Sequence, residues 1–108
     1  KAMHKGHIAT AKIAGTGSAI NVSLGFAPDH IRIVNVTKLS EFEWFKEMAA
    51  DSAVKHITDG TISLITSDGI TPFAGVSGSA GEGFTIGTDG RLNADADVIY
   101  YYAFSADS

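Results

Sequence analysis

The sequence contains no cysteine among its 108 residues. Disulfide bonds, thiolate nucleophiles and thiolate zinc sites are therefore excluded, and the chain has no need of an oxidising compartment. It also lacks an apolar run near the roughly 20 residues of a membrane-spanning helix, and its N-terminal stretch KAMHKGHIATAKIAGTG lacks the apolar core of a secretory signal. We therefore expect a soluble protein made in the cytoplasm, without a membrane partner. The first residue is Lys1 and not Met, which predicts trimming or truncation at the N-terminus.

Basic residues are scarce, above all in the second half of the chain. The formal net charge is −4, and Arg91 is the only lysine or arginine after Lys55. Residues 1–56 hold seven basic and five acidic side chains, whereas residues 57–108 hold one and seven. Because an acidic surface repels a phosphate backbone, we expect no binding to nucleic acid, and a basic protein surface is the better electrostatic partner.

Short segments rich in Ile, Val, Phe, Tyr and Thr alternate with Gly, Ser, Thr and Asp, which is typical of an all-β protein. We predict a single-domain antiparallel β-sandwich or β-barrel of about eight short strands. Residues 19–108 are expected to form this β domain. Residues 1–18 are expected to be either the first strand or an N-terminal arm that becomes ordered on contact with a neighbour. The expected strands are His7–Ala14, Ala19–Leu24, His30–Val36, Glu41–Lys46, Ala53–Ile57, Thr61–Thr66, Gly83–Ile86 and Asp97–Phe104.

Three segments between the strands carry further expectations. The dipeptides Asp68-Gly69 and Asp89-Gly90 tolerate positive φ and predict turns, the second of them in a hairpin with the acids that follow. Ala74–Gly83 has four glycines in ten residues and predicts a mobile surface loop. The segment LSEFEWFKEMAADSA is ambiguous, because Phe42 recurs with later residues at helical spacing but also alternates with Trp44 as in a strand.

Two of the expected strands are apolar on both faces. Ile31 and Ile33 oppose Val34 and Val36, and the segment from Val98 to Phe104 has the same property. Both are expected to be central strands, or strands with one face in an interface. Since a chain of this length covers both faces of two strands with difficulty, we expect a homo-oligomer, with a trimer favoured.

The acidic run of Asn93, Asp95 and Asp97 is a candidate for a metal or catalytic site. If these residues fill positions 1, 3 and 5 of a calcium loop, positions 6 and 12 are Val98 and Phe104, where glycine and glutamate are required. Asp95 and Asp97 are expected to leave the same solvated end of a sheet, which gives no cleft for paired carboxylates. A solvated turn is the favoured interpretation, and an irregular calcium site is the alternative.

The remaining chemical motifs are also incomplete. His4 and His7 have the spacing of a helical metal pair, but the surrounding residues do not predict a helix, so exposed histidines are favoured. The stretches GTGSAI and GEGFTI lack the third glycine of a phosphate-binding loop. The sequence therefore predicts no catalytic residue, no cofactor and no metal ligand.

Aromatic residues gather at two places in the sequence. Because a stacking platform for bases needs basic neighbours, packing in the core and in an interface is the better use of them. The interface candidates are Trp44, Phe45, Tyr100, Tyr101, Tyr102 and Phe104.

Three stretches carry a resemblance to a protein family: VSLGFAPDHIRIVNVTK (Val22–Lys38), EFEWFKEMA (Glu41–Ala49) and GFTIGTDGRLNADADVIYYYAF (Gly83–Phe104). Together they resemble small structural proteins of tailed-bacteriophage virions, which include head decoration and cement proteins. The shared pieces are strand and turn patterns without catalytic residues. The resemblance also implies that Glu41–Lys46 is a strand.

The resemblance implies a non-enzymatic protein of the virion. The leading hypothesis is a capsid decoration, or cement, protein at the capsid surface, which binds the major capsid protein and stabilises the head. The alternatives are a tail- or fibre-associated module that contacts another virion protein, and a small domain that binds carbohydrate or calcium at the host surface, with Trp44 or the tyrosines as sugar platforms.

Overall fold

A computed structural model shows an all-β domain of eight antiparallel strands in one curled sheet, which confirms the predicted fold class. The structure describes residues 7–75 and 81–106. Within these residues, no helix is long and apolar enough to cross a membrane. The strands are β1 (His7–Ala14), β2 (Ile20–Ser23), β3 (His30–Asn35), β4 (Ser40–Phe45), β5 (Ser52–His56), β6 (Ile62–Phe73), β7 (Gly83–Ile86) and β8 (Val98–Ser105).

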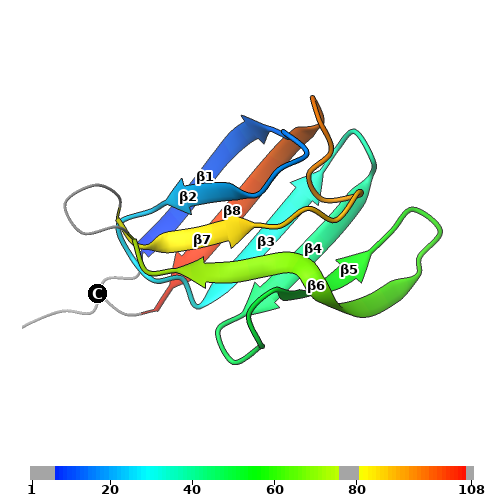
Figure 1. Ribbon diagram of the computed structural model, residues 1–108. Helices are drawn as coiled ribbons and strands as arrows, with labels where there is room; N and C mark the ends of the chain where they lie inside the picture. The colour runs from blue at the N-terminus through cyan, green and yellow to red at the C-terminus, as the bar shows by residue number, and fades with distance from the viewer. Residues whose placement is uncertain (1–6, 76–80, 107–108) are drawn as a thin grey trace, which may run out of the picture.

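The sheet folds over on itself into two layers. Its strand order is β1-β8-β3-β4-β5-β6-β7-β2, and every neighbouring pair is antiparallel. Figure 1 shows β2, β7 and β6 in front of β1, β8, β3 and β4, with β5 and β6 at the side where the sheet turns over. β3 and β8 lie inside the sheet with a neighbour on each side, which confirms that both are central strands.

The core fills the space between the two layers. Inward positions alternate along the strands, so that Ile31 and Ile33 of β3 and Phe42 and Trp44 of β4 are almost fully buried. Burial of each such side chain contributes about 2 kcal/mol. The segment whose pattern was ambiguous is thus strand β4, because its alternating residues Phe42 and Trp44 share the inward face. The other buried hydrophobic residues are Val22, Ala53, Ile70, Phe84, Ile86, Leu92, Ile99 and Ala103.

The prediction of a turn at Asp68-Gly69 is wrong. These residues lie inside the 12-residue strand β6, where Ala53 of β5 pairs with Ile65 but the adjacent Ser52 pairs with Ile70. The extra residues form a bulge, and Asp68 has a φ of 62°. The dipeptide does contain a residue with positive φ, as its composition indicates, but this residue bends a strand between the layers and does not reverse the direction of the chain.

The prediction of a hairpin around Asp89-Gly90 is also wrong. β7 pairs with β6 and β2, whereas β8 pairs with β1 and β3, so the segment 87–97 connects the two layers. Asn93 and Asp97 are only 1% and 3% exposed, which corrects the expectation that the acidic run is a solvated turn. We call residues 87–97 the crossover segment.

Two other predictions touch residues outside the described ranges. His7–Ala14 forms β1 with the predicted bounds, whereas the first six residues of the expected arm lie outside the described part. Residues 76–80 of the expected loop Ala74–Gly83 also lie outside it, and Gly83 opens β7.

Candidate interaction surface

The outward side chains of β1, β8, β3 and β4 form one continuous surface. Antiparallel registers place directly opposite residues on the same face of a sheet. Tyr102, for example, pairs with Thr10 on one side and with Arg32 on the other, and Arg32 pairs with Glu43. We call this surface the aromatic face; it consists of Ile8, Thr10, Lys12, His30, Arg32, Val34, Glu41, Glu43, Phe45, Tyr100, Tyr102 and Phe104.

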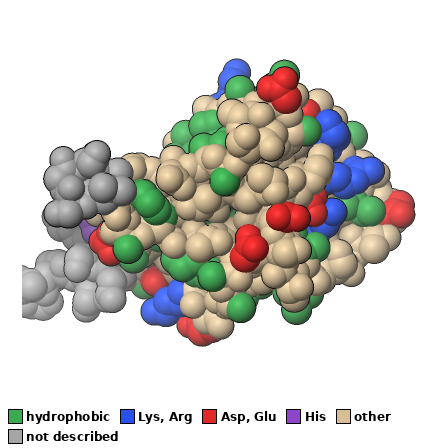
Figure 2. All heavy atoms as spheres, in the orientation of Figure 1, with side chains coloured by type: hydrophobic (Ala, Val, Ile, Leu, Met, Phe, Trp, Pro, Cys, Tyr) green, Lys and Arg blue, Asp and Glu red, His purple; other side chains and the backbone are tan. Residues whose placement is uncertain are grey.

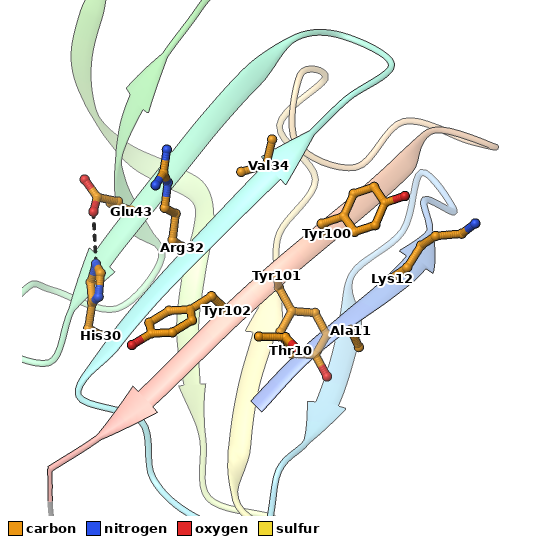
Figure 3. Close-up of a pocket in the computed structure, with 10 residues that line it drawn as sticks. All are labelled: Thr10, Ala11, Lys12, His30, Arg32, Val34, Glu43, Tyr100, Tyr101 and Tyr102. Atoms are coloured by element: carbon orange, nitrogen blue, oxygen red, sulfur yellow. Dashed lines mark hydrogen bonds and ion pairs between the residues drawn. The ribbon is translucent and has the colours of Figure 1, made fainter. Parts of the chain in front are cut away.

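A shallow groove of about 770 Å³ runs over the aromatic face. Figure 3 shows Tyr100 and Tyr102 on β8, with Val34 and Arg32 on one side and Lys12 and Thr10 on the other. The side chains are open to solvent at several points, since Tyr100 is 45% and Phe45 43% exposed. Exposed aromatic rings of this kind favour contact with another molecule.

Ionisable groups on the aromatic face are arranged in pairs. Arg32 contacts Glu41 at 2.8 Å, and His30 Nε2 lies 3.0 Å from Glu43 Oε2. His30 also stacks on Phe45, with ring centroids 4.6 Å apart. Lys12 makes no ion pair with any residue in the described ranges. Because exposed ion pairs contribute under about 1 kcal/mol, these groups are available for exchange with charges on a partner.

The outer surface of the other layer has a different chemistry. Thr71, Thr85 and Asn21 form a polar row across β6, β7 and β2, and Thr85 Oγ1 donates to Asn21 Oδ1 at 2.7 Å. Figure 2 shows this side of the molecule, where hydrophobic side chains are scattered among polar ones. The contrast between the two layers identifies the aromatic face as the candidate interaction surface.

The structure divides the six interface candidates between the core and the surface. Phe45, Tyr100, Tyr102 and Phe104 lie on the aromatic face. Trp44 is buried and its Nε1 donates to the Ala49 carbonyl at 3.1 Å, so it has no surface to offer to a partner or to a sugar.

Tyr101 also points away from the aromatic face. Its ring meets Phe84 edge to face, with centroids 5.3 Å apart. Burial raises the pKa of its hydroxyl above the ordinary value of 10.0. Tyr101 therefore belongs to the packing between the layers.

The polar members of the aromatic face were missed in the sequence. The signal for them was the period-2 alternation, which puts the even-numbered residues of the segments 8–14, 30–34 and 98–104, and the odd-numbered residues of the segment 41–45, on one side of their strands. Alternation assigns residues to a face within one strand but says nothing of which strands are neighbours. The missed residues are Thr10, Lys12, His30, Arg32, Glu41 and Glu43.

Asp97 forms a polar cluster that fixes the end of the crossover segment. Asn35 Nδ2 donates to Asp97 Oδ2 at 2.9 Å, and Lys38 Nζ lies 3.1 Å from Asp97 Oδ1. Asn35 Oδ1 in turn accepts from the backbone N–H of Lys38 at 2.8 Å. The hydrogen bond from Asn35, and then the Lys38 ammonium, hold the pKa of Asp97 below its ordinary value of 3.8. Both carboxylate oxygens are occupied by the fold.

Asn93 anchors the middle of the crossover segment. Its Oδ1 accepts from the Thr16 N–H at 2.8 Å, and its Nδ2 donates to the carbonyls of Ser18 at 2.6 Å and Gly87 at 3.1 Å. Asn93 and Asp97 thus both hold structure together, which leaves only the exposed Asp95 of the acidic run. No group of three or more His, Asp or Glu suited to a metal occurs in residues 7–75 and 81–106.

Comparisons with known proteins give no match. No protein-family model matches the chain, and neither curated proteins nor solved structures show a significant similarity to it. The resemblance described above therefore stays a prediction from the quoted motifs.

Proposed function

We propose that this protein is a non-enzymatic virion structural protein of a tailed phage, and specifically a capsid decoration protein that binds the major capsid protein and stabilises the head. The observation that carries the binding role is the aromatic face, whose rings and paired charges stand on the interior strands β8, β3 and β4. Such a surface provides contact area at low cost in side-chain entropy. The virion location comes from the motif resemblance in Val22–Lys38, Glu41–Ala49 and Gly83–Phe104.

The distribution of carboxylates supports contact with a basic shell. Asp89 and Asp97 are neutralised by Lys55 and Lys38. Six other carboxylates are exposed and make no ion pair with a described residue, and they lie outside the aromatic face, five of them in loops or turns and Asp68 in the bulge of β6: Glu47, Asp51, Asp59, Asp68, Glu82 and Asp95. Many copies of a weak electrostatic contact add up on a lattice by multivalency.

The test is binding to expanded heads of the encoding phage that lack the protein. We expect the purified chain to sediment with the heads and to raise their melting temperature. Tyr102→Asp is expected to weaken this binding at least about tenfold, because it puts a carboxylate among the rings of the aromatic face. Thr85→Asp adds the same charge at an outward position of the polar layer and is the matched control. Absence of both binding and stabilisation by the wild-type chain contradicts the proposal.

The alternative location within the virion is the tail or its fibres. The same aromatic face and acidic loops would then contact a different virion protein. The position of the subunit in a virion reconstruction separates the two locations.

A carbohydrate-binding role at the host surface is the second candidate. It is favoured by the groove in which Tyr100 and Tyr102 lie beside the polar side chains of Arg32 and Glu43. A glycan array tests it, with Tyr100→Ala as the variant: a sugar that stacks on Tyr100 should lose binding, while the fold is unchanged because that side chain is 45% exposed. If the wild-type chain binds no glycan on the array, either with or without a chelator, the carbohydrate-binding role is contradicted.

A further inference from the structure

We infer that the aromatic face pairs with the aromatic face of a second copy of this chain, about a two-fold axis that runs between β8 and β3. The inference builds on the proposed function, because both use the aromatic face as a protein-docking surface. It assigns the aromatic face to a second copy and the contact with the shell to the exposed acidic loops, so that Tyr102→Asp weakens binding to heads by breaking the dimer and its two-point attachment. A two-fold pairing differs from the trimer expected from the sequence.

The registers set the aromatic face out as three rows across four strands. In the order β1, β8, β3, β4, the first row is Lys12, Tyr100, Val34 and Glu41. The second row is Thr10, Tyr102, Arg32 and Glu43, and the third is Ile8, Phe104, His30 and Phe45. Lys12, which makes no ion pair with a described residue, is at one side of the face, and the carboxylates of Glu41 and Glu43 are at the other.

A two-fold axis parallel to the strands places the lysine side of each copy opposite the carboxylate side of the other. It places β1 of one copy over β4 of the other and β8 over β3, while each row stays over itself. Lys12 then faces Glu41 of the second copy, and by symmetry Glu41 faces the other Lys12. Such an isologous contact is self-complementary and closes with two subunits.

The central pairs fit as well as the outer ones. Tyr102 comes over Arg32 of the second copy, where ring and guanidinium attract each other by a cation–π contact. Tyr100 comes over Val34, and Ile8, which is 64% exposed, comes over Phe45. Each pair joins side chains that favour contact, and none brings like charges together. The usual angle of about −30° between packed sheets moves the outer pairs by a few Å, which the long Lys12 side chain can follow.

The size of the face sets the expected strength. Four strands about 4.8 Å apart, over about eight residues of strand, cover on the order of 500 Å² per copy. The total of about 1,000 Å² is at the lower end of specific interfaces. We therefore expect a dimer of 11.3-kDa chains that dissociates on dilution into the micromolar range.

The decisive experiment is sedimentation equilibrium on the purified chain and on two charge-reversal variants. Lys12→Glu alone and Glu41→Lys alone place like charges opposite each other in both outer pairs, so each is expected to weaken dimerisation at least about tenfold. An equal mixture of the two variants restores opposite charges at both pairs of the mixed dimer. Association is therefore expected to return in the mixture. Lys12 and Glu41 are separated by β8 and β3 within one chain, so an effect inside the monomer cannot produce this recovery.

The control variant is Glu47→Lys, which reverses an exposed charge in the β4–β5 turn, off the aromatic face, and is expected to dimerise like the wild type. Circular dichroism checks that every variant keeps its β structure. A wild-type chain that stays monomeric over roughly 1 to 200 µM, a trimer, or a mixture that fails to recover association would each overturn the inference. The sedimentation experiment contains no heads, so a chain that dimerises but fails to bind heads contradicts only the proposed function. A chain that stays monomeric but still binds heads contradicts only the pairing of the aromatic faces.

Discussion

Replacing Asp97 by alanine is expected to lower the free energy of unfolding by about 3 kcal/mol. The Asp97 side chain is buried and receives hydrogen bonds from Asn35 and Lys38. Without it, Nδ2 of Asn35 keeps only the longer contact of 3.3 Å to the Leu92 carbonyl, and the end of the crossover segment loses its anchor. Urea unfolding followed by Trp44 fluorescence measures the change, since Trp44 is the only tryptophan.

Two further variants separate the hydrogen bonds from the charge. Asp97→Asn keeps the shape and an acceptor for Asn35 but loses the charge, so we expect a loss of about 1 kcal/mol. Lys38→Met removes the ammonium from a side chain that is 38% exposed, and solvent screening limits its expected effect to under about 1 kcal/mol. An Asp97→Ala variant within about 0.5 kcal/mol of the wild type would show that the cluster does not hold the crossover segment.

The same cluster predicts a loss of stability in acid. The fold lowers the pKa of Asp97 below 3.8, so the unfolded chain binds this proton more tightly than the folded one. The contribution of Asp97 to the stability of the fold is fully present above the pKa that this group has in the unfolded chain. It is lost as the pH falls through the lower pKa that the group has in the folded chain. The wild type is therefore expected to lose its advantage over Asp97→Asn below about pH 4, as measured by urea midpoints across the pH range.

The strands could be predicted from the sequence because their cause is local. In β8, the alternation of Ile99 and Ala103 with Tyr100 and Tyr102 sets one row inward and one outward, whatever the neighbouring strands are. The pairing of strands depends on distant segments, and the loops show this most clearly. Asp89-Gly90 has the composition of a hairpin turn, yet the buried side chains of Asn93 and Asp97 make hydrogen bonds to the segments 16–18 and 35–38, which no local pattern indicates.

Only part of the aromatic face could be predicted from the sequence. The aromatic segment near the C-terminus indicated its rings, and Tyr100 and Tyr102 lie on the side of β8 that alternation predicts. Trp44 was expected beside them because it is large and aromatic, but its parity within β4 puts it on the inward side with Phe42. Lys12 and Glu41 became part of one surface only through the registers of three strand pairs, which a single sequence does not contain.

The crossover segment also depends on a glycine at its first position. Gly87 N–H donates to the Gly69 carbonyl at 2.7 Å, so the backbone of the segment lies directly on the bulge of β6. A Cβ atom at Gly87 would overlap the carbonyl groups of Asp68 and Gly69. These are backbone atoms that cannot rotate away, and the same stretch of bulge lies against Ser52 of β5.

Gly87→Ala is therefore expected to cost about 3 kcal/mol, because either the bulge or the crossover segment must move. For a domain of this size, that loss lowers the melting temperature by roughly 15 °C. Gly90→Ala is the matched control three residues along: its Cβ would meet nothing within 4 Å and its φ is not positive. Its melting temperature should stay close to that of the wild type, since such a change mainly reduces the entropy of the unfolded chain. Equal melting temperatures for the two variants would contradict the close contact between the crossover segment and the bulge. The expected difference would instead show that the crossover segment is held in place by its contact with the bulge, where β6 bends and the sheet folds over.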